Sequence, residues 1–209
     1  MTLPANKLIT VNDRGARAAT TFGSVAAGGG NMVFIKKLTA SSSGTLSFVD
    51  GASSVVLDNT YKEYLFTFKD IHGSAGSPFT VNFRDGDTAY DATKTTTFYY
   101  AYNKEDDSAR ALAYDTGFDL AQSTGTQPLN YNMGTGNDES LCGTLHLFNP
   151  SSTTFVKHFI ATTNMYDGTY QQEIFVAGYC NVTAAIDGVQ FKLNSGNIDA
   201  GDICLYGIL

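Results

Sequence analysis

Three aspartates gather around one glycine in the stretch Phe83–Thr93, FRDGDTAYDAT, and raise the question of a calcium site. An EF-hand loop places oxygen ligands at its first, third and fifth positions, a glycine at the sixth and a glutamate at the twelfth. Counted from Asp85, only Asp85 and Asp87 match, because Asp91 falls where a backbone carbonyl is normally the ligand. An Asp-Gly pair between strands instead favours a tight hairpin turn. The sequence therefore predicts a polar turn without a resident metal, whose three carboxylates form at most a weak cation site or a contact loop.

Motifs for catalysis are missing from the sequence. It contains neither a G-x-S-x-G nucleophile elbow nor an H-E-x-x-H metal-binding pattern. His72, His146 and His158 are scattered, and the last two sit within strand-like alternations. A histidine that packs or hydrogen-bonds there is a simpler interpretation than a general base. Two carboxylates that converge from distant loops stay open as an alternative, but the prediction is a protein that is not an enzyme and that binds no cofactor.

Charge is distributed unevenly along the chain. The net charge is −7 for the whole chain, whereas residues 1–37 carry five basic residues against one aspartate. A basic, glycine-rich start on an acidic body favours an arm that docks on another surface, and a solvated tail is the alternative. The basic residues that would anchor such an arm include Arg14, Arg17, Lys36 and Lys37. The acidic body argues against a nucleic-acid partner, because phosphate binding needs a basic face.

Three cysteines, Cys142, Cys180 and Cys204, form no C-x-x-C pair, which excludes a zinc ribbon and a redox motif. Each lies in a predicted strand, where a free cysteine is expected to behave as a small buried apolar residue. The opening MTLPANKLITV has no apolar signal-peptide core, and no apolar run reaches the length of a membrane span. We expect synthesis in a reducing cytoplasm and no membrane insertion.

Alternation of apolar and polar residues dominates the sequence after the glycine run at positions 28–30. This period of two is typical of half-buried strands, whose successive side chains point to opposite faces. We expect residues 1–31 to form an extended N-terminal anchoring arm and residues 32–209 to form one β-sandwich domain. The expected strands are Met32–Leu38, Thr45–Val49, Glu63–Ile71, Phe79–Arg84, Thr95–Tyr102, Leu141–Phe148, Thr154–Met165, Gln172–Val182, Val189–Leu193 and Ile203–Ile208.

Helical signals are few. Glu105–Tyr114 (EDDSARALAY) could form one or two helical turns, because its acidic residues suit a helix N-terminus. The polar stretch from Asp115 to Glu139 is expected to be a long excursion at one edge or tip. About ten short strands with turn signals between them predict an all-β fold, a single antiparallel β-sandwich that is jelly-roll-like.

Surface aromatics offer another kind of site. The segment TTTFYYAY places Tyr99 on one face of a strand and Tyr100 and Tyr102 on the other. Exposed rings of this kind could stack on a glycan. The simpler interpretation is that one face packs in the core and that the other lies at a subunit contact.

Four segments are informative when they are taken together: DNTYKEYLFTFKDIH (Asp58–His72), FRDGDTAYDATKTTTFYYAY (Phe83–Tyr102), LFNPSSTTFVKHF (Leu147–Phe159) and GVQFKLNSGNIDAGDICLYGIL (Gly188–Leu209). They resemble a group of virion structural proteins from tailed phages, especially phages of marine bacteria and cyanobacteria. The most specific part of the resemblance is the closing Leu-Tyr-Gly-Ile at 205–208. The sequence departs from those proteins at Gly73, where they tend to have proline, and at Cys204, where they commonly have a more basic residue.

The resemblance implies a location in the virion after synthesis in the bacterial host, and it supplies no catalytic residues. It implies a tail-fibre or host-attachment component with other virion proteins as partners. A homo-oligomer such as a trimer is expected, because fibres are often trimeric, and a host surface glycan is a further expected partner. A capsid decoration or cement protein is the close alternative, and a glycan-binding or glycan-degrading module is a more remote one.

Overall fold

β-Strands supply all the regular secondary structure of residues 31–209, the part of the chain that the computed structural model describes. Met32–Leu209 forms one compact unit. The expected arm of residues 1–31, with Arg14 and Arg17, lies outside the described residues apart from Asn31. The strands are β1 Met32–Thr39, β2 Leu46–Val49, β3 Glu63–Gly73, β4 Phe79–Arg84, β5 Lys94–Lys104, β6 Arg110–Tyr114, β7 Gln127–Pro128, β8 Leu141–Phe148, β9 Lys157–Tyr166, β10 Tyr170–Cys180, β11 Gly188–Leu193 and β12 Ile198–Ile208.

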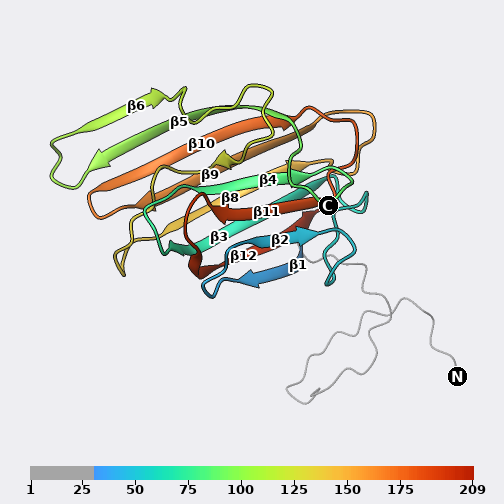
Figure 1. Ribbon diagram of the computed structural model, residues 1–209, viewed down its shortest axis with the longest axis horizontal. Coiled ribbons are helices and arrows are strands. Elements are labelled where there is room, and N and C mark those ends of the chain that lie inside the picture. The colour runs from blue at the N-terminus through green and yellow to red at the C-terminus, as the bar shows by residue number, and fades with distance from the viewer. Residues whose placement is uncertain (1–30) are drawn as a thin grey trace, which may run out of the picture. The chain divides into compact units, whose positions relative to one another are not determined.

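The strands form two antiparallel sheets that pack face to face (Figure 1). The large sheet has the order β1-β12-β3-β8-β9-β10-β5-β6, and the small sheet has the order β2-β11-β4-β7. The predicted all-β, antiparallel β-sandwich is confirmed. Within residues 31–209 there is no helix long and apolar enough to cross a membrane.

Alternation along β3 decides which side chains enter the core. Tyr64, Phe66 and Phe68 are almost fully buried, whereas Leu65 and Thr67 between them lie on the outer face and are only half-buried. The predicted two faces of this strand are therefore correct. A shift of one residue would turn every one of these rings toward solvent, so the pattern also fixes the register.

Five phenylalanines fill the space between the sheets at its centre. Phe191 on β11 has no exposed surface, and its ring lies 5.2–6.3 Å from four neighbouring rings. Three of these contacts are edge-to-face and the fourth is stacked, geometries that aromatic pairs prefer. The neighbours are Phe48, Phe66, Phe68 and Phe79.

The helical turns expected at Glu105–Tyr114 are absent, and that prediction is wrong. The segment makes a turn and then forms strand β6, which pairs with residues 99–103 of β5. Asp106 fixes the turn, since its carboxylate accepts hydrogen bonds from the Lys104 ammonium at 2.9 Å and the Ser108 amide at 3.0 Å. Open backbone groups along β5 outweigh the weak helix preference of so short a segment.

Residues 115–139, expected to be an excursion at one edge or tip, do lie at a sheet edge but are not only a surface segment. They include β7 at the edge of the small sheet, and they also bury side chains between the sheets. Leu129 and Asn130 have no exposed surface, and the Asn130 side-chain carbonyl accepts a 2.7 Å hydrogen bond from the Phe79 amide. A polar side chain that satisfies a backbone donor holds this excursion against β4.

Candidate functional site

The loop between β4 and β5 brings the three predicted aspartates together. One carboxylate oxygen from each of Asp85, Asp87 and Asp91 lies within 4.8 Å of the others. Gly86 has φ of +108°, which a glycine adopts readily. The predicted hairpin is wrong, however, because β4 belongs to the small sheet and β5 to the large one. The loop is a crossing between the two sheets.

Charges around this loop are already arranged without a metal. Arg84 makes a bidentate ion pair with Asp187, with both N–O distances at 2.9 Å. This pairing raises the pKa of Arg84. Partial burial, followed by the neighbouring carboxylates of Asp91 and Asp87, raises the pKa of Asp85. Calcium takes six to eight oxygen ligands, and the loop offers three carboxylates, two of them on exposed residues.

We expect Asp85→Asn to stabilise the protein slightly at pH 7, by less than about 1 kcal/mol. A raised pKa in the folded state means that ionised Asp85 disfavours folding. Its favourable contribution is present below the unfolded pKa of about 3.9 and is lost as the pH rises through the folded pKa. The gain of the variant should therefore appear at neutral pH and vanish in acid. Thermal unfolding at a series of pH values measures it.

Calcium provides the matched test of the same loop. Millimolar Ca²⁺ is expected to leave the melting temperature of the wild type unchanged, and Asp138→Asn, at an exposed position outside the loop, serves as the control. A rise in melting temperature that wild type shows and Asp85→Asn lacks would instead establish a cation site.

Beneath the acidic loop lie two lysines that the sequence interpretation overlooked. Lys94 and Lys157 have no exposed surface and flank Cys180 across three neighbouring strands, β5, β10 and β9. The Lys94 ammonium donates to the Ala92 carbonyl at 2.9 Å, and Lys157 donates to three backbone carbonyls at 2.9–3.3 Å. Burial lowers the pKa of Lys94 to about 8 and raises that of the Cys180 thiol to about 12. Because protein atoms enclose all three side chains, we assign them a structural role.

Histidines in the described residues do not assemble a catalytic site. His146 Nδ1 lies 2.5 Å from Glu63 Oε1 on the outer face of the large sheet. His72 Nε2 contacts the Gly136 carbonyl at 3.1 Å, and His158 is exposed beside the ring of Tyr179. The expected packing and hydrogen-bonding roles agree with these contacts.

The other predicted residues have ordinary surroundings. Lys37 makes an ion pair with Asp202 on the neighbouring strand at 3.1 Å, and Lys36 is half-buried in β1. Cys180 and Cys204 are buried as predicted. Cys142 is exposed, contrary to the prediction, because it lies on the outer face of β8, where its sulfur accepts a hydrogen bond from the Asp70 amide at 3.3 Å.

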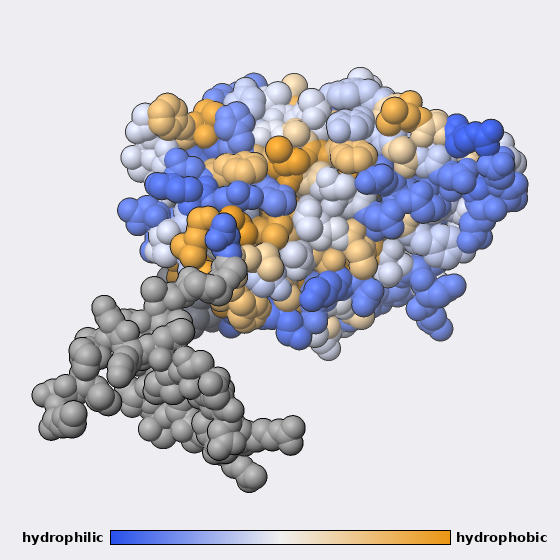
Figure 2. All heavy atoms as spheres, turned by 180° about the vertical axis from the view of Figure 1, so that it is seen from behind, coloured by the Kyte–Doolittle hydropathy of each residue, from blue (hydrophilic) through white to orange (hydrophobic). Residues whose placement is uncertain are grey.

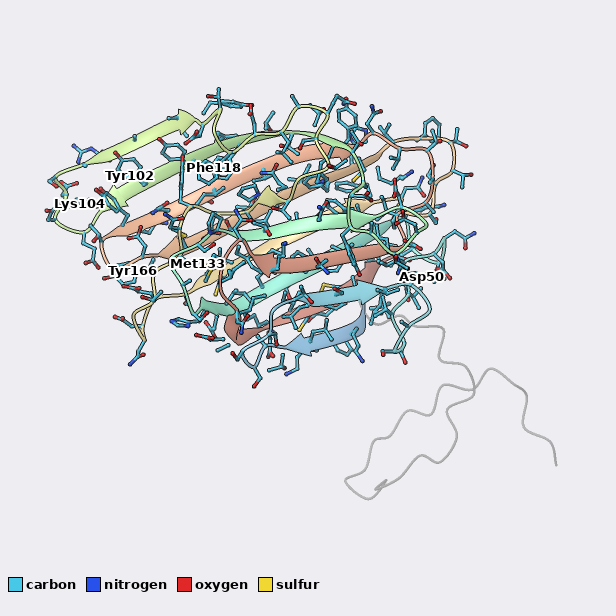
Figure 3. All side chains as sticks on the ribbon, viewed as in Figure 1. Asp50, Tyr102, Lys104, Phe118, Met133 and Tyr166 are labelled. Carbon is cyan, nitrogen blue, oxygen red and sulfur yellow. The ribbon has the colours of Figure 1, made fainter. Side chains whose placement is uncertain are left out.

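A hollow of about 470 Å³ lies at the end of the sandwich where β5 ends and β10 begins. Side chains of these two strands and of the 115–139 excursion meet there. Four tyrosines form much of its lining, namely Tyr100, Tyr102, Tyr131 and Tyr170. Figure 3 shows Tyr102, Phe118, Met133 and Tyr166 at this end of the sandwich and Asp50 at the opposite end. The sequence indicated only Tyr100 and Tyr102.

Comparison with protein-family models, with curated proteins and with solved structures finds no match.

The outer face of the large sheet carries a row of side chains that crosses five strands. Paired positions along this row include Phe34, Tyr206, Leu65, His146 and Ile160. Phe34 and Ile160 are 58% and 49% exposed. Figure 2 shows apolar clusters separated by hydrophilic residues on the side opposite to the view of Figure 1. Apolar clusters of this kind on a sheet face are typical of contacts between proteins.

Proposed function

We propose that this chain is a non-enzymatic structural protein of a tailed-phage virion, a tail-fibre or host-attachment component that docks through its N-terminal arm. The observation that carries the proposal is the order in which the chain visits the two sheets. The resemblance of the segments near Asp58–His72 and Gly188–Leu209 to phage virion proteins supports the same assignment.

Eight of the strands pair in nested fashion, first with last. β1 pairs with β12, β2 with β11, β3 with β8 and β4 with β7. These strands give the sheet orders β1-β12-β3-β8 and β2-β11-β4-β7. We infer a jelly roll, the arrangement of two four-stranded sheets found in viral capsid and lectin domains. Hairpins β5–β6 and β9–β10 are then insertions that widen the first sheet.

Assembly into a larger particle agrees with the outer face of the large sheet. Its exposed apolar side chains, including Phe34, Leu112 and Ile160, offer contact area to neighbouring subunits or to other virion proteins. A closed symmetric homo-oligomer would cover part of this face.

Deleting residues 1–30 is expected to abolish incorporation into particles while leaving the β-sandwich folded. The sandwich has its own core within Met32–Leu209, and the basic residues Arg14 and Arg17 would be lost with the arm. The measurement is the amount of tagged protein in purified particles. Charge reversal of Lys36 and Lys37 in the full chain is the second variant, and unchanged incorporation of the deletion would refute the arm as the anchor.

Copy number separates the tail from the head. A tail or fibre component occurs in about 6–18 copies, whereas a capsid decoration or cement protein occurs in hundreds, because the two structures have different symmetry. Quantifying the protein in purified particles therefore decides between the proposed role and the capsid alternative. Release of reducing ends from host polysaccharide would overturn the non-enzymatic assignment.

A further inference from the structure

We propose that the tyrosine-lined hollow on the inserted hairpins is a binding site for a neutral saccharide. This inference rests on the proposed function only where it assigns the sugar to the host surface. Sugar binding itself can be measured on the isolated protein, without the particle.

Ring geometry supports the apolar half of such a site. Tyr100 and Tyr102 lie two residues apart on the inner face of β5, with centroids 6.0 Å apart and planes at 15°. Tyr131 meets Tyr100 edge-on at 5.1 Å, and Tyr170 meets Tyr102 edge-on at 5.3 Å. Edge-to-face contacts hold the rings in place, so ligand binding costs little side-chain entropy. Rings that are only half-buried keep surface for the C–H face of a pyranose.

Two carboxylates supply the polar half. Asp115 accepts hydrogen bonds from the Tyr131 hydroxyl and, at 2.8 Å, from the Gly117 amide. Asp167 accepts from the Tyr170 amide at 2.8 Å and from the Gln172 side-chain amide at 2.7 Å. A carboxylate has about four lone-pair sites. Both groups are therefore fixed in position and still have capacity to accept hydrogen bonds from sugar hydroxyls.

Burial of Gln172 indicates a built site rather than a chance surface depression. Gln172 is 8% exposed and lines the hollow. Its amide nitrogen is used on Asp167, which leaves the side-chain carbonyl oxygen as a further acceptor. The volume of about 470 Å³ lies within the usual range of small-ligand sites, and the hollow combines aromatic rings with polar groups that are held in place.

Charge restricts the class of ligand. No lysine or arginine is among the residues that line the hollow, and nearby Lys104 is held by Asp106 and Ser108 in the β5–β6 turn. An anionic sugar would meet two carboxylates without a compensating cation. A metal cage is also disfavoured, because the only convergent set of three metal-ligating side chains in residues 31–209 is at Asp85, Asp87 and Asp91. A neutral, hydroxyl-rich ligand with an apolar face satisfies both halves of the site.

Saturation-transfer NMR on the full chain tests the proposal. The probes are methyl glycosides of glucose, galactose, mannose, rhamnose and N-acetylglucosamine at millimolar concentration, with glucuronate and choline as charged comparisons. We expect transfer to at least one neutral glycoside and none to glucuronate. Loss of a stacking ring in Tyr102→Ala should weaken binding about tenfold.

Tyr99→Ala is the matched control, since Tyr99 lies on the same strand but stacks on Phe175 on the opposite face. It should bind like the wild type. If Tyr102→Ala does not fold, amide shift mapping on the wild type decides, and the shifts must centre on β5 and β10. Three results overturn the proposal: no neutral glycoside binds, Tyr102→Ala binds like Tyr99→Ala, or choline binds in place of the glycosides. Particle incorporation is measured separately, so failure of sugar binding leaves the virion assignment standing.

Discussion

Phe191→Ala is expected to lower the free energy of unfolding by about 3–5 kcal/mol. Phe191 has no exposed surface, and its ring contacts four other buried phenylalanines that come from both sheets. Removing it leaves a cavity that neighbouring strands cannot fill, because each ring is held by its own strand register. Urea unfolding followed by tyrosine fluorescence and by circular dichroism measures the loss, and coincident transitions justify a two-state analysis.

Two further substitutions control that experiment. Phe155→Ala removes the same ring from a site that is 69% exposed, so stability should change by less than about 0.5 kcal/mol. Phe191→Leu keeps most of the buried volume and should cost less than Phe191→Ala. Equal losses at positions 155 and 191 would contradict the central place of Phe191 in the core.

Lys94→Met is expected to act in the opposite direction and to raise the free energy of unfolding at pH 7. Burial lowers the pKa of Lys94 to about 8 from 10.5. At about 1.4 kcal/mol per pKa unit, keeping the ammonium charged inside the fold costs on the order of 3 kcal/mol. Methionine has a similar shape without the charge, and buried ionic groups replaced in this way commonly give gains of about 1–4 kcal/mol.

The pH dependence identifies the cause. Between pH 8 and 10.5 the folded protein releases the Lys94 proton before the unfolded chain does. The unfolded state then binds more protons, so this group makes stability rise with pH over that range. Cys180 acts in the reverse sense, since burial raises its pKa to about 12. Because Cys180 is present in both proteins, the difference between variant and wild type reports mainly on Lys94, and this difference should shrink from pH 8 to pH 10.5.

Lys69→Met, at an exposed position on β3, is the control for a change of net charge. It should leave stability and its pH profile nearly unchanged. A Lys94→Met variant less stable than wild type at pH 7 would mean that the bond to the Ala92 carbonyl and the attraction of Asp91 and Asp85 outweigh burial.

Strand positions could be predicted from the sequence because the alternation is local. In β3, the alternating rings of Tyr64, Phe66 and Phe68 indicate directly which face is buried. The same signal was present for Lys157, which shares its face with Phe159 and Ala161 in the expected strand. A lysine is rarely buried, so the residue type predicts exposure at a position where the alternation predicts burial.

The hollow could not be predicted, because its walls come from separate parts of the chain. Tyr102 and Gln172 are paired across β5 and β10, about 70 residues apart in sequence. Asp115 joins them from a third segment. No periodicity within one segment shows which distant strand will become its neighbour. The helical prediction for Glu105–Tyr114 failed for a related reason, because pairing with the preceding strand β5 decides its conformation and its local composition does not.

Strand order also has a mechanical consequence. The chain enters the large sheet at β1, whereas the hollow lies on β5 and β10 near the other edge, across about 25–30 Å of hydrogen-bonded strands. In a particle anchored through residues 1–31 and bound to a host through the hollow, tension would load these strand pairs in series. Pairing of β5 with β10 runs without a register shift over 11 residues, but β1–β12 is interrupted between Phe34 and Lys36. Of these two pairs, β1–β12 on the anchor side would therefore separate first under load, and the β5–β10 pair at the hollow would hold longer.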